Sequence, residues 1–152
     1  MSVKIPVKFT DKLKVKKSPE EVYAFISKIE NIAPLVPGID EFKKVKKDVY
    51  RWKFKPMGMK GVSVVLEYET KFSFKENEEI FWNTIEGSGN AEMTGKVRIK
   101  KQKSGAELDV EIEMTPDLPI PSIFRKLAEP FVKSEFEKMM GIFAKRVKEA
   151  LE

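Results

Sequence analysis

The segment SPEEVYAFISKIENIAPLVPGIDEF, residues 18–42, joins a clear helix signal to an apolar stretch that two prolines and a glycine interrupt. Ser18 is a typical N-cap, Pro19 suits the first helical position, and Glu21 completes a capping box. The apolar residues that follow at helical spacing are Val22, Phe25, Ile26 and Ile29. Together these signals predict a helix over about residues 18–29.

On both sides of this segment, apolar and polar residues alternate with the period of two that indicates half-buried strands. Such strands are predicted over residues 3–15, 39–47, 49–56, 62–75, 80–89, 91–101 and 106–115. The first strand carries a row of lysines on its outer face, and the last carries a row of acidic residues. Because opposite charges favour neighbouring antiparallel strands, we expect these two strands to pair. The pattern of the strand at 80–86 does not decide which of its faces points inward.

The C-terminal part of the chain is predicted to be helical from about residue 121 to residue 151, with a broad apolar stripe. Pro130 lies inside this helix and is expected to kink it or to divide it into two segments. The helix is the one element long enough to cover the apolar face of a curved antiparallel sheet. Curvature separates the sheet from the helix in the middle, which predicts a small-molecule cavity between them.

Composition narrows the chemistry of the chain. Its 152 residues include no Cys and no His, which excludes disulfides, thiolate nucleophiles, the usual zinc sites and a histidine general base. The lysines behind the net charge of +5 are interleaved with glutamates, so a nucleic-acid partner is not expected. The N-terminus lacks the apolar core of a signal peptide, and no apolar run reaches the roughly 18 residues of a membrane span. We therefore expect a cytoplasmic protein, and its abundance of Lys and Glu is typical of thermophiles.

The order of elements resembles the START-related superfamily of helix-grip proteins, which includes polyketide cyclases and lipid-transfer domains. Three motifs are similar to those of the branch that contains the G-type subunit of carbon monoxide dehydrogenase: SPEEVYAFISKIENIAPLVPGI, GMKG before a long strand, and IEGSGNAEMTGKVRI. The resemblance spans nearly the whole chain and implies one α+β domain over residues 1–152. In that fold a curved seven-stranded antiparallel sheet wraps around a long C-terminal helix, and one or two short helices join the first two strands.

The interrupted apolar stretch IAPLVPGI, residues 32–39, follows the first helix in this layout. Its prolines exclude a regular helix or a central strand, so we expect a corner that closes one end of the cavity. Ile32, Leu35 and Val36 are expected to turn towards the C-terminal helix. A hydrophobic plug and a mobile gate over a ligand entrance both fit this pattern.

The candidate ligand-binding residues are those expected on the inner faces of the sheet and the C-terminal helix. They are Asp11, Ile32, Leu35, Val36, Tyr50, Trp52, Phe54, Met59, Leu66, Tyr68, Thr70, Phe72, Trp82, Met93, Phe124, Leu127, Phe131 and Met139. Asp11, Tyr68 and Thr70 are the polar members that could orient a ligand. Asp11 fits either a solvated position at the rim or a carboxylate inside the cavity. No catalytic set, metal site or cofactor is predicted.

These residues favour a non-catalytic protein that binds, and could carry, a hydrophobic or amphipathic small molecule such as a lipid, an isoprenoid quinone or a polycyclic compound. The resemblance also implies that some relatives carry quinones or lipids. Two other functions stay open: an enzyme of the polyketide cyclase or dehydrase type that uses the same cavity, and a ribosome-associated or other protein-interaction role. A transient membrane or protein partner fits the sequence as well, and the oligomeric state is not determined by it.

Overall fold

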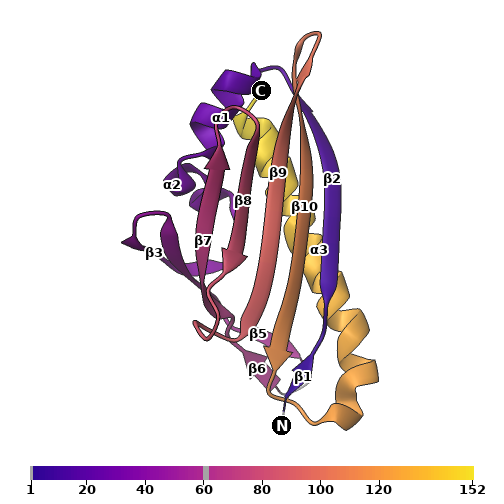
Figure 1. Cartoon of the computed structure of the whole chain (residues 1–152). Coiled ribbons are helices and arrows are strands. Elements are labelled where there is room, and N and C mark those ends of the chain that lie inside the picture. Colours follow the sequence, from indigo (N-terminus) through magenta and orange to yellow (C-terminus); the bar gives the residue numbers. More distant parts are fainter. Residues whose placement is uncertain (1, 60–61) are drawn as a thin grey trace.

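The structure is a computed structural model that describes residues 2–59 and 62–152, except for the side chains of Met59 and Val62. Figure 1 shows the arrangement of the elements. In chain order these are β1 (Val3–Lys4), β2 (Val7–Val15), α1 (Pro19–Ile26), α2 (Ile29–Ile32), the 3-10 turn η1 (Ala33–Leu35), β3 (Ile39–Lys46), β4 (Val49–Phe54), β5 (Met57–Met59), β6 (Val62–Val64), β7 (Glu67–Lys75), β8 (Glu79–Thr84), β9 (Ala91–Gln102), β10 (Gly105–Leu118), the 3-10 turn η2 (Ser122–Phe124) and α3 (Arg125–Ala150).

The main sheet is antiparallel and runs in the order β3-β4-β7-β8-β9-β10, with β1 and β2 both paired to the far side of β10. The strands β1 and β2 follow one another along this edge, so the sheet is seven strands wide, as predicted. The long helix α3 lies behind the curved sheet in the view of Figure 1 and runs along its inner face. The predicted α+β architecture, a curved sheet wrapped around a C-terminal helix, is confirmed.

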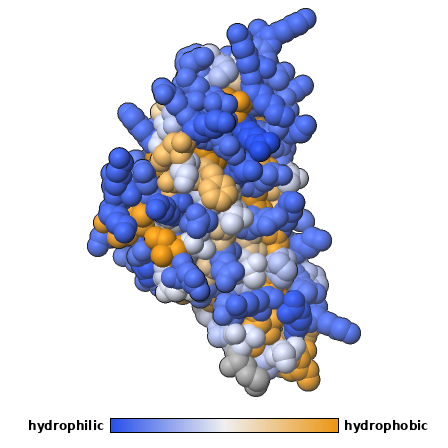
Figure 2. Space-filling model, viewed as in Figure 1, coloured by the Kyte–Doolittle hydropathy of each residue, from blue (hydrophilic) through white to orange (hydrophobic). Residues whose placement is uncertain are grey.

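The predicted pairing of the first and last strands is confirmed by the register of β2 with β10. Lys12 lies opposite Asp109, and Lys8 lies opposite Glu113 with 3.6 Å between its Nζ and the carboxylate. On the other side of β10, Lys100 of β9 places its Nζ 2.7 Å from the Asp109 carboxylate. Rows of opposite charge therefore alternate across the outer face of the sheet, which Figure 2 shows covered mainly by hydrophilic residues.

Helix α1 begins at the predicted capping box. The Ser18 hydroxyl accepts a hydrogen bond from the Glu21 backbone N–H, and the Ser18 N–H donates to the Glu21 carboxylate, both at 3.2 Å. The helix ends at Ile26, three residues earlier than predicted. The Asn31 side-chain amide donates to the Phe25 carbonyl at 3.0 Å and so satisfies a group at the open end of the helix.

Helix α3 continues through Pro130, so the prediction that this residue could divide the helix is wrong. Proline removes one backbone hydrogen bond, here the one to the Lys126 carbonyl. Both residues are exposed, so water can satisfy that carbonyl near the start of the helix. Of the helices described, none is long and apolar enough to cross a membrane.

The predicted strand over residues 62–75 is two strands, β6 and β7, and β6 pairs with β5 in a separate two-stranded sheet. The residues between β6 and β7, Val65 and Leu66, form hydrogen bonds outside the regular pairing of these strands. The Asn90 side-chain amide donates to the Val65 carbonyl at 2.7 Å, and the Phe54 N–H donates to the Leu66 carbonyl at 2.9 Å. These bonds satisfy the backbone while the chain turns from one sheet into the other.

Candidate ligand cavity

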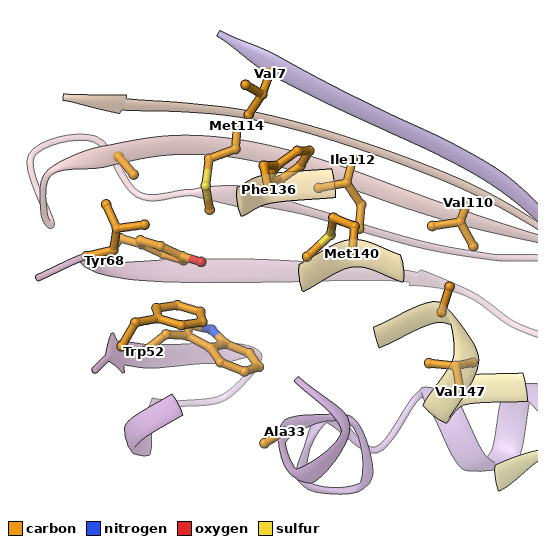
Figure 3. Packing of buried hydrophobic residues seen from close by; sticks show 14 of the residues in the cluster. Val7, Ala33, Trp52, Tyr68, Val110, Ile112, Met114, Phe136, Met140 and Val147 are labelled. Carbon is orange, nitrogen blue, oxygen red and sulfur yellow. The ribbon is translucent and has the colours of Figure 1, made fainter. Parts of the chain in front are cut away.

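A cavity of about 160 Å³ lies between the inner face of the main sheet and α3. Its walls are almost wholly apolar and come from most strands of the sheet, from α1 and α2, and from α3. Figure 3 shows Trp52 and Tyr68 on strands of the sheet and Phe136 and Met140 on α3. A cavity of roughly 150 Å³ with apolar walls is large enough to bind benzene. In the structure described, the cavity can therefore hold a group about the size of one ring.

Most of the residues predicted to bind a ligand line this cavity. They come from α2 and the end of η1, from β4, β7, β8 and β9, from the turn before β7, and from α3. These residues are Ile32, Val36, Trp52, Phe54, Leu66, Tyr68, Thr70, Phe72, Trp82, Met93, Phe131 and Met139.

The structure does not bring Asp11 or Tyr50 to the cavity. Asp11 is exposed on the edge strand β2, and its carboxylate accepts a hydrogen bond from the Lys12 N–H at 2.8 Å. An edge strand leaves room for water beside an inward position, so the expectation of a cavity carboxylate is wrong. Tyr50 is buried, but its hydroxyl donates to the Glu30 carboxylate at 3.4 Å and its ring stacks on Phe42.

Leu35, Phe124 and Leu127 also lie outside the cavity. Leu35 is half-buried in η1 and packs against the core from its outer side. Phe124 is the last residue of η2 and Leu127 lies in the first turn of α3, and both are exposed. The side chain of Met59 lies outside the described residues.

Several lining residues were not among the candidates predicted from the sequence. One group is the inner face of β10, which includes Leu108, Val110 and Ile112. The alternation of residues 106–115 predicted that these side chains point inward, and that signal could have included them. Glu135 was also missed. It lines the cavity four residues after Phe131, so helical spacing from Phe131 could have indicated it.

Of the three residues in IAPLVPGI that were predicted to face the C-terminal helix, two lie beside α3. Ile32 and Val36 line the cavity together with Met139 of α3. Gly38 has φ of +77°, a conformation that favours glycine, and a Cβ there would lie 3.9 Å from the Met139 methyl carbon. The corner therefore forms part of the cavity wall beside Met139 of the helix.

Trp82 faces the cavity, which decides the orientation of the strand at 80–86. Its partner across the strand pair is Gly95. A Cβ on Gly95 would lie 2.0 Å from two carbons of the indole, so the indole lies directly over the glycine backbone. The Trp82 ring also contacts Phe72, with 5.6 Å between ring centroids. Gly95 thus makes the space in which this wall of the cavity forms.

Two side chains of β7, Tyr68 and Thr70, bring hydroxyl groups to the sheet side of the cavity. Tyr68 and Thr70 are each only 1% exposed, and both line the cavity. The Thr70 hydroxyl accepts a hydrogen bond from the Trp52 indole N–H at 2.8 Å, which leaves its own proton free to donate. No atom of the described residues forms a hydrogen bond with the Tyr68 hydroxyl, which points from the sheet towards α3 in Figure 3.

Burial raises the pKa of the Tyr68 hydroxyl well above its ordinary value, so this group stays protonated at neutral pH. Residues two apart on a strand share a face and lie about 7 Å from each other. Tyr68 and Thr70 therefore present two neighbouring hydrogen-bond donors to a cavity whose other walls are mainly apolar. Such an arrangement suits a molecule that is apolar along its length and has a hydrogen-bond acceptor at one point.

A family model described as polyketide cyclase / dehydrase and lipid transport matches residues 6–148 of the chain. The chain matches none of the curated proteins. Among solved structures, a START superfamily protein from Mycobacterium smegmatis is similar, with a TM-score of 0.68 and 18% identity over 95% of this chain and 96% of that one. A conserved protein from Geobacillus kaustophilus has a TM-score of 0.68 and 11% identity, with 98% and 95% of the two chains covered.

A third similar structure is the di-domain ARO/CYC StfQ from the steffimycin biosynthetic pathway. Its TM-score is 0.63 and its identity 12%, and the match covers 97% of this chain but 51% of that protein. The chain thus spans about half of the di-domain protein. At these identities the three structures establish a shared fold, and they agree with the resemblance to the START-related superfamily.

Proposed function

The chain belongs to the polyketide cyclase/dehydrase and lipid transport family, and on this premise we propose that it binds a hydrophobic or amphipathic small molecule between the sheet and α3. In this proposal the protein holds or carries its ligand without transforming it. A lipid, an isoprenoid quinone or a polycyclic compound has the required character, and the cavity as described holds a part of such a molecule about the size of one ring.

The observation that carries the proposal is the Tyr68 hydroxyl, which is buried in an apolar cavity with no hydrogen-bond partner among the described residues. The hydroxyl oxygen is open to the cavity, because the fully enclosed side-chain atoms without a partner among the described residues are Asp109 Oδ1 and Asp117 Oδ1. A ligand carbonyl or hydroxyl in the cavity can therefore accept a hydrogen bond from Tyr68, which contributes about 0.5–1.5 kcal/mol. The apolar remainder of the ligand adds roughly 25 cal/mol for each Å² of surface buried.

The ionisable groups of the cavity favour binding over catalysis. Of the described residues that line it, only Tyr68 and Glu135 carry ionisable side chains. Tyr68 is held in its protonated form by burial. Glu135 is half-buried on α3 and forms no hydrogen bond or ion pair with another described residue. General acid–base catalysis needs a group whose pKa lies near the working pH, and burial moves the pKa of the Tyr68 hydroxyl away from that range.

Mass spectrometry of the purified protein and of its organic extract tests the proposal. We expect one class of lipid, quinone or polycyclic compound in near-stoichiometric amount. Ala144 lines the cavity and is buried, so Ala144→Leu fills part of the space and should lower the amount of ligand recovered. Ala24→Leu changes an exposed helical alanine in the same way and serves as the matched control.

Two results would count against the proposal. One is a protein that yields no ligand and takes up neither a fatty acid nor a quinone when these are supplied. The other is chemical conversion of the bound compound by the wild-type protein, which would favour an enzyme of the cyclase or dehydrase type.

A further inference from the structure

The end of the molecule at which α3 begins carries three exposed, large apolar side chains. Ile123 is 82% exposed, Leu127 58% and Phe124 48%, and we call these three residues the apolar tip. Figure 2 shows apolar residues at the lower end of the molecule, where α3 starts in Figure 1. The other exposed large apolar residues that the structure describes belong to four different elements: Val45, Phe74, Phe81 and Ile142. The apolar tip is therefore a cluster and not a scattered set.

The apolar tip continues along α3 into the cavity. Leu127 and Phe131 lie four residues apart on α3, the spacing of neighbours on one helical face, and Ile123 precedes them in η2. Phe131 lines the cavity, as do Val132 and Glu135 in the next turn. A molecule that enters or leaves along this side of α3 therefore passes the apolar tip.

Basic residues flank the apolar tip. Arg125 and Lys126 lie between Phe124 and Leu127, and both are exposed. Arg125 forms an ion pair with Glu129, with 3.3 Å between its Nε and the carboxylate, and no described residue forms an ion pair with Lys126. Apolar side chains interleaved with basic ones suit the boundary between the head groups and the acyl chains of an anionic bilayer.

The size of the apolar tip argues against a second copy of the chain as its partner. Complete burial of three such side chains removes on the order of 300 Å² from water, since one large aromatic side chain buries roughly 150–250 Å². A stable protein–protein interface buries roughly 800 Å² on each partner. Insertion into a lipid surface has no such minimum area, because it depends on a few apolar side chains and on local charge.

We propose that the apolar tip docks onto the surface of a lipid bilayer that carries anionic head groups. Ile123, Phe124 and Leu127 enter the boundary of the acyl chains, and Lys126 contacts the head groups. Docking in this way brings the Phe131 side of the cavity to the bilayer. The docking surface goes beyond ligand binding and can be tested separately from it.

Flotation of the full chain with vesicles tests this proposal. One set of vesicles contains equal parts of phosphatidylcholine and phosphatidylglycerol, and the other contains phosphatidylcholine alone. We expect binding to the first set, weaker binding to the second, and a loss of about tenfold or more for the double variant Ile123→Ser/Leu127→Ser. Lys126→Glu should lower binding to the anionic vesicles by about fivefold or more, with little effect on neutral ones.

The matched control is Val45→Ser/Ile142→Ser, which removes two exposed apolar side chains outside the apolar tip. It should bind vesicles as the wild type does. The proposal is overturned if the wild type binds neither set of vesicles, or if the control loses binding as strongly as the tip variant. It is also overturned if sedimentation velocity shows wild-type dimers that the tip variant cannot form while neither protein binds vesicles.

Organic extraction of the tip variant separates this proposal from the proposed function. Because the substituted residues lie outside the cavity, the variant should still contain the cavity ligand. A variant that keeps its ligand and also keeps vesicle binding refutes docking alone. A wild-type protein that docks but never contains a ligand refutes the ligand-binding function alone.

Discussion

Replacement of Tyr68 by phenylalanine separates a functional role of its hydroxyl from a structural one. The substitution keeps the ring, whose centroid lies 5.9 Å from that of Phe54, and removes only the oxygen. Because no described residue accepts a hydrogen bond from this oxygen, its removal breaks no bond of the fold. We therefore expect Tyr68→Phe to weaken ligand binding without destabilising the protein, whereas loss of a hydroxyl that stabilises the fold would have the opposite result.

The structure sets the size of both effects. Because the hydroxyl is open to the cavity and no described residue pairs with it, the free energy of unfolding of Tyr68→Phe should lie within about 1 kcal/mol of that of the wild type. One neutral hydrogen bond to a ligand contributes about 0.5–1.5 kcal/mol. Its loss should raise the Kd of a ligand with an acceptor roughly 2- to 13-fold.

The buried Tyr68 hydroxyl should also make the stability of the fold depend on pH. Burial raises the pKa of Tyr68 in the folded protein above the value of about 10 that it has in the unfolded chain. The unfolded chain therefore loses the proton first, and the contribution of Tyr68 to stability is lost as the pH rises above about 10. Tyr68→Phe removes this contribution, so its stability should fall less steeply with alkaline pH.

Two small molecules of the same shape make the binding test specific. Acetophenone carries a carbonyl where α-methylstyrene carries a CH₂ group, and NMR titration measures the affinity of each. The wild type should bind acetophenone more tightly than α-methylstyrene, because the carbonyl accepts a hydrogen bond from Tyr68. In Tyr68→Phe this difference in affinity should disappear. Tyr50→Phe is the matched control, because Tyr50 lies outside the cavity and its hydroxyl donates to Glu30. Urea unfolding at neutral and alkaline pH measures stability.

This role of the Tyr68 hydroxyl is refuted if Tyr68→Phe is less stable than the wild type by more than about 1 kcal/mol, since the hydroxyl would then have a structural partner. It is refuted equally if both proteins bind acetophenone with the same preference over α-methylstyrene. An identical loss of preference in Tyr50→Phe would show that the effect is not specific to the cavity.

Two further substitutions test the local structure by urea unfolding. Gly95→Ala should lose about 1–3 kcal/mol of stability and weaken ligand binding, because its Cβ would lie 2.0 Å from the Trp82 indole. The control Gly141→Ala, in the open part of α3, should gain about 0.5–1 kcal/mol of stability. Equal effects of the two substitutions would contradict the close contact at Gly95. Ser18→Ala removes the capping box, whose hydrogen bonds lower the pKa of Glu21. Because the pKa of Glu21 is lower in the folded protein than the value of 4.5 in the unfolded chain, its carboxylate stabilises the fold above pH 4.5, and this stabilisation is lost as the pH falls through the folded pKa. Ser18→Ala should therefore lose less stability than the wild type between neutral and acid pH. An unchanged pH profile would contradict this prediction.

The fold followed from patterns that are local in the sequence or that repeat along a strand. The capping box at Ser18 depends on residues three apart, and the pairing of β2 with β10 depends on two long rows of opposite charge. Other features depend on contacts between distant residues. At the end of α1 the Asn31 side chain donates to the Phe25 carbonyl, and between β6 and β7 the Asn90 side chain donates to the Val65 carbonyl. No local pattern predicts which carbonyl such a side chain will reach.

The candidate site shows the same limit. Alternation placed Tyr68 and Thr70 on the inner face of β7, where the structure has them. Both faces of the strand at 80–86 carry aromatic or aliphatic residues, so alternation could not orient Trp82, and the missing Cβ of Gly95 on the neighbouring strand makes room for the indole. Alternation also placed Asp11 inward, but it takes no account of the water that reaches an edge strand.

The edges of the main sheet have a consequence for how the protein behaves at high concentration. The edge strands β2 and β3 leave backbone N–H and C=O groups unpaired, and such groups can add a strand from another molecule. Both strands carry exposed lysines, among them Lys12 and Lys14 on β2 and Lys43 and Lys44 on β3. Two molecules that approached edge to edge would bring these like charges together. The lysines therefore disfavour growth of the sheet by edge-to-edge pairing of two molecules.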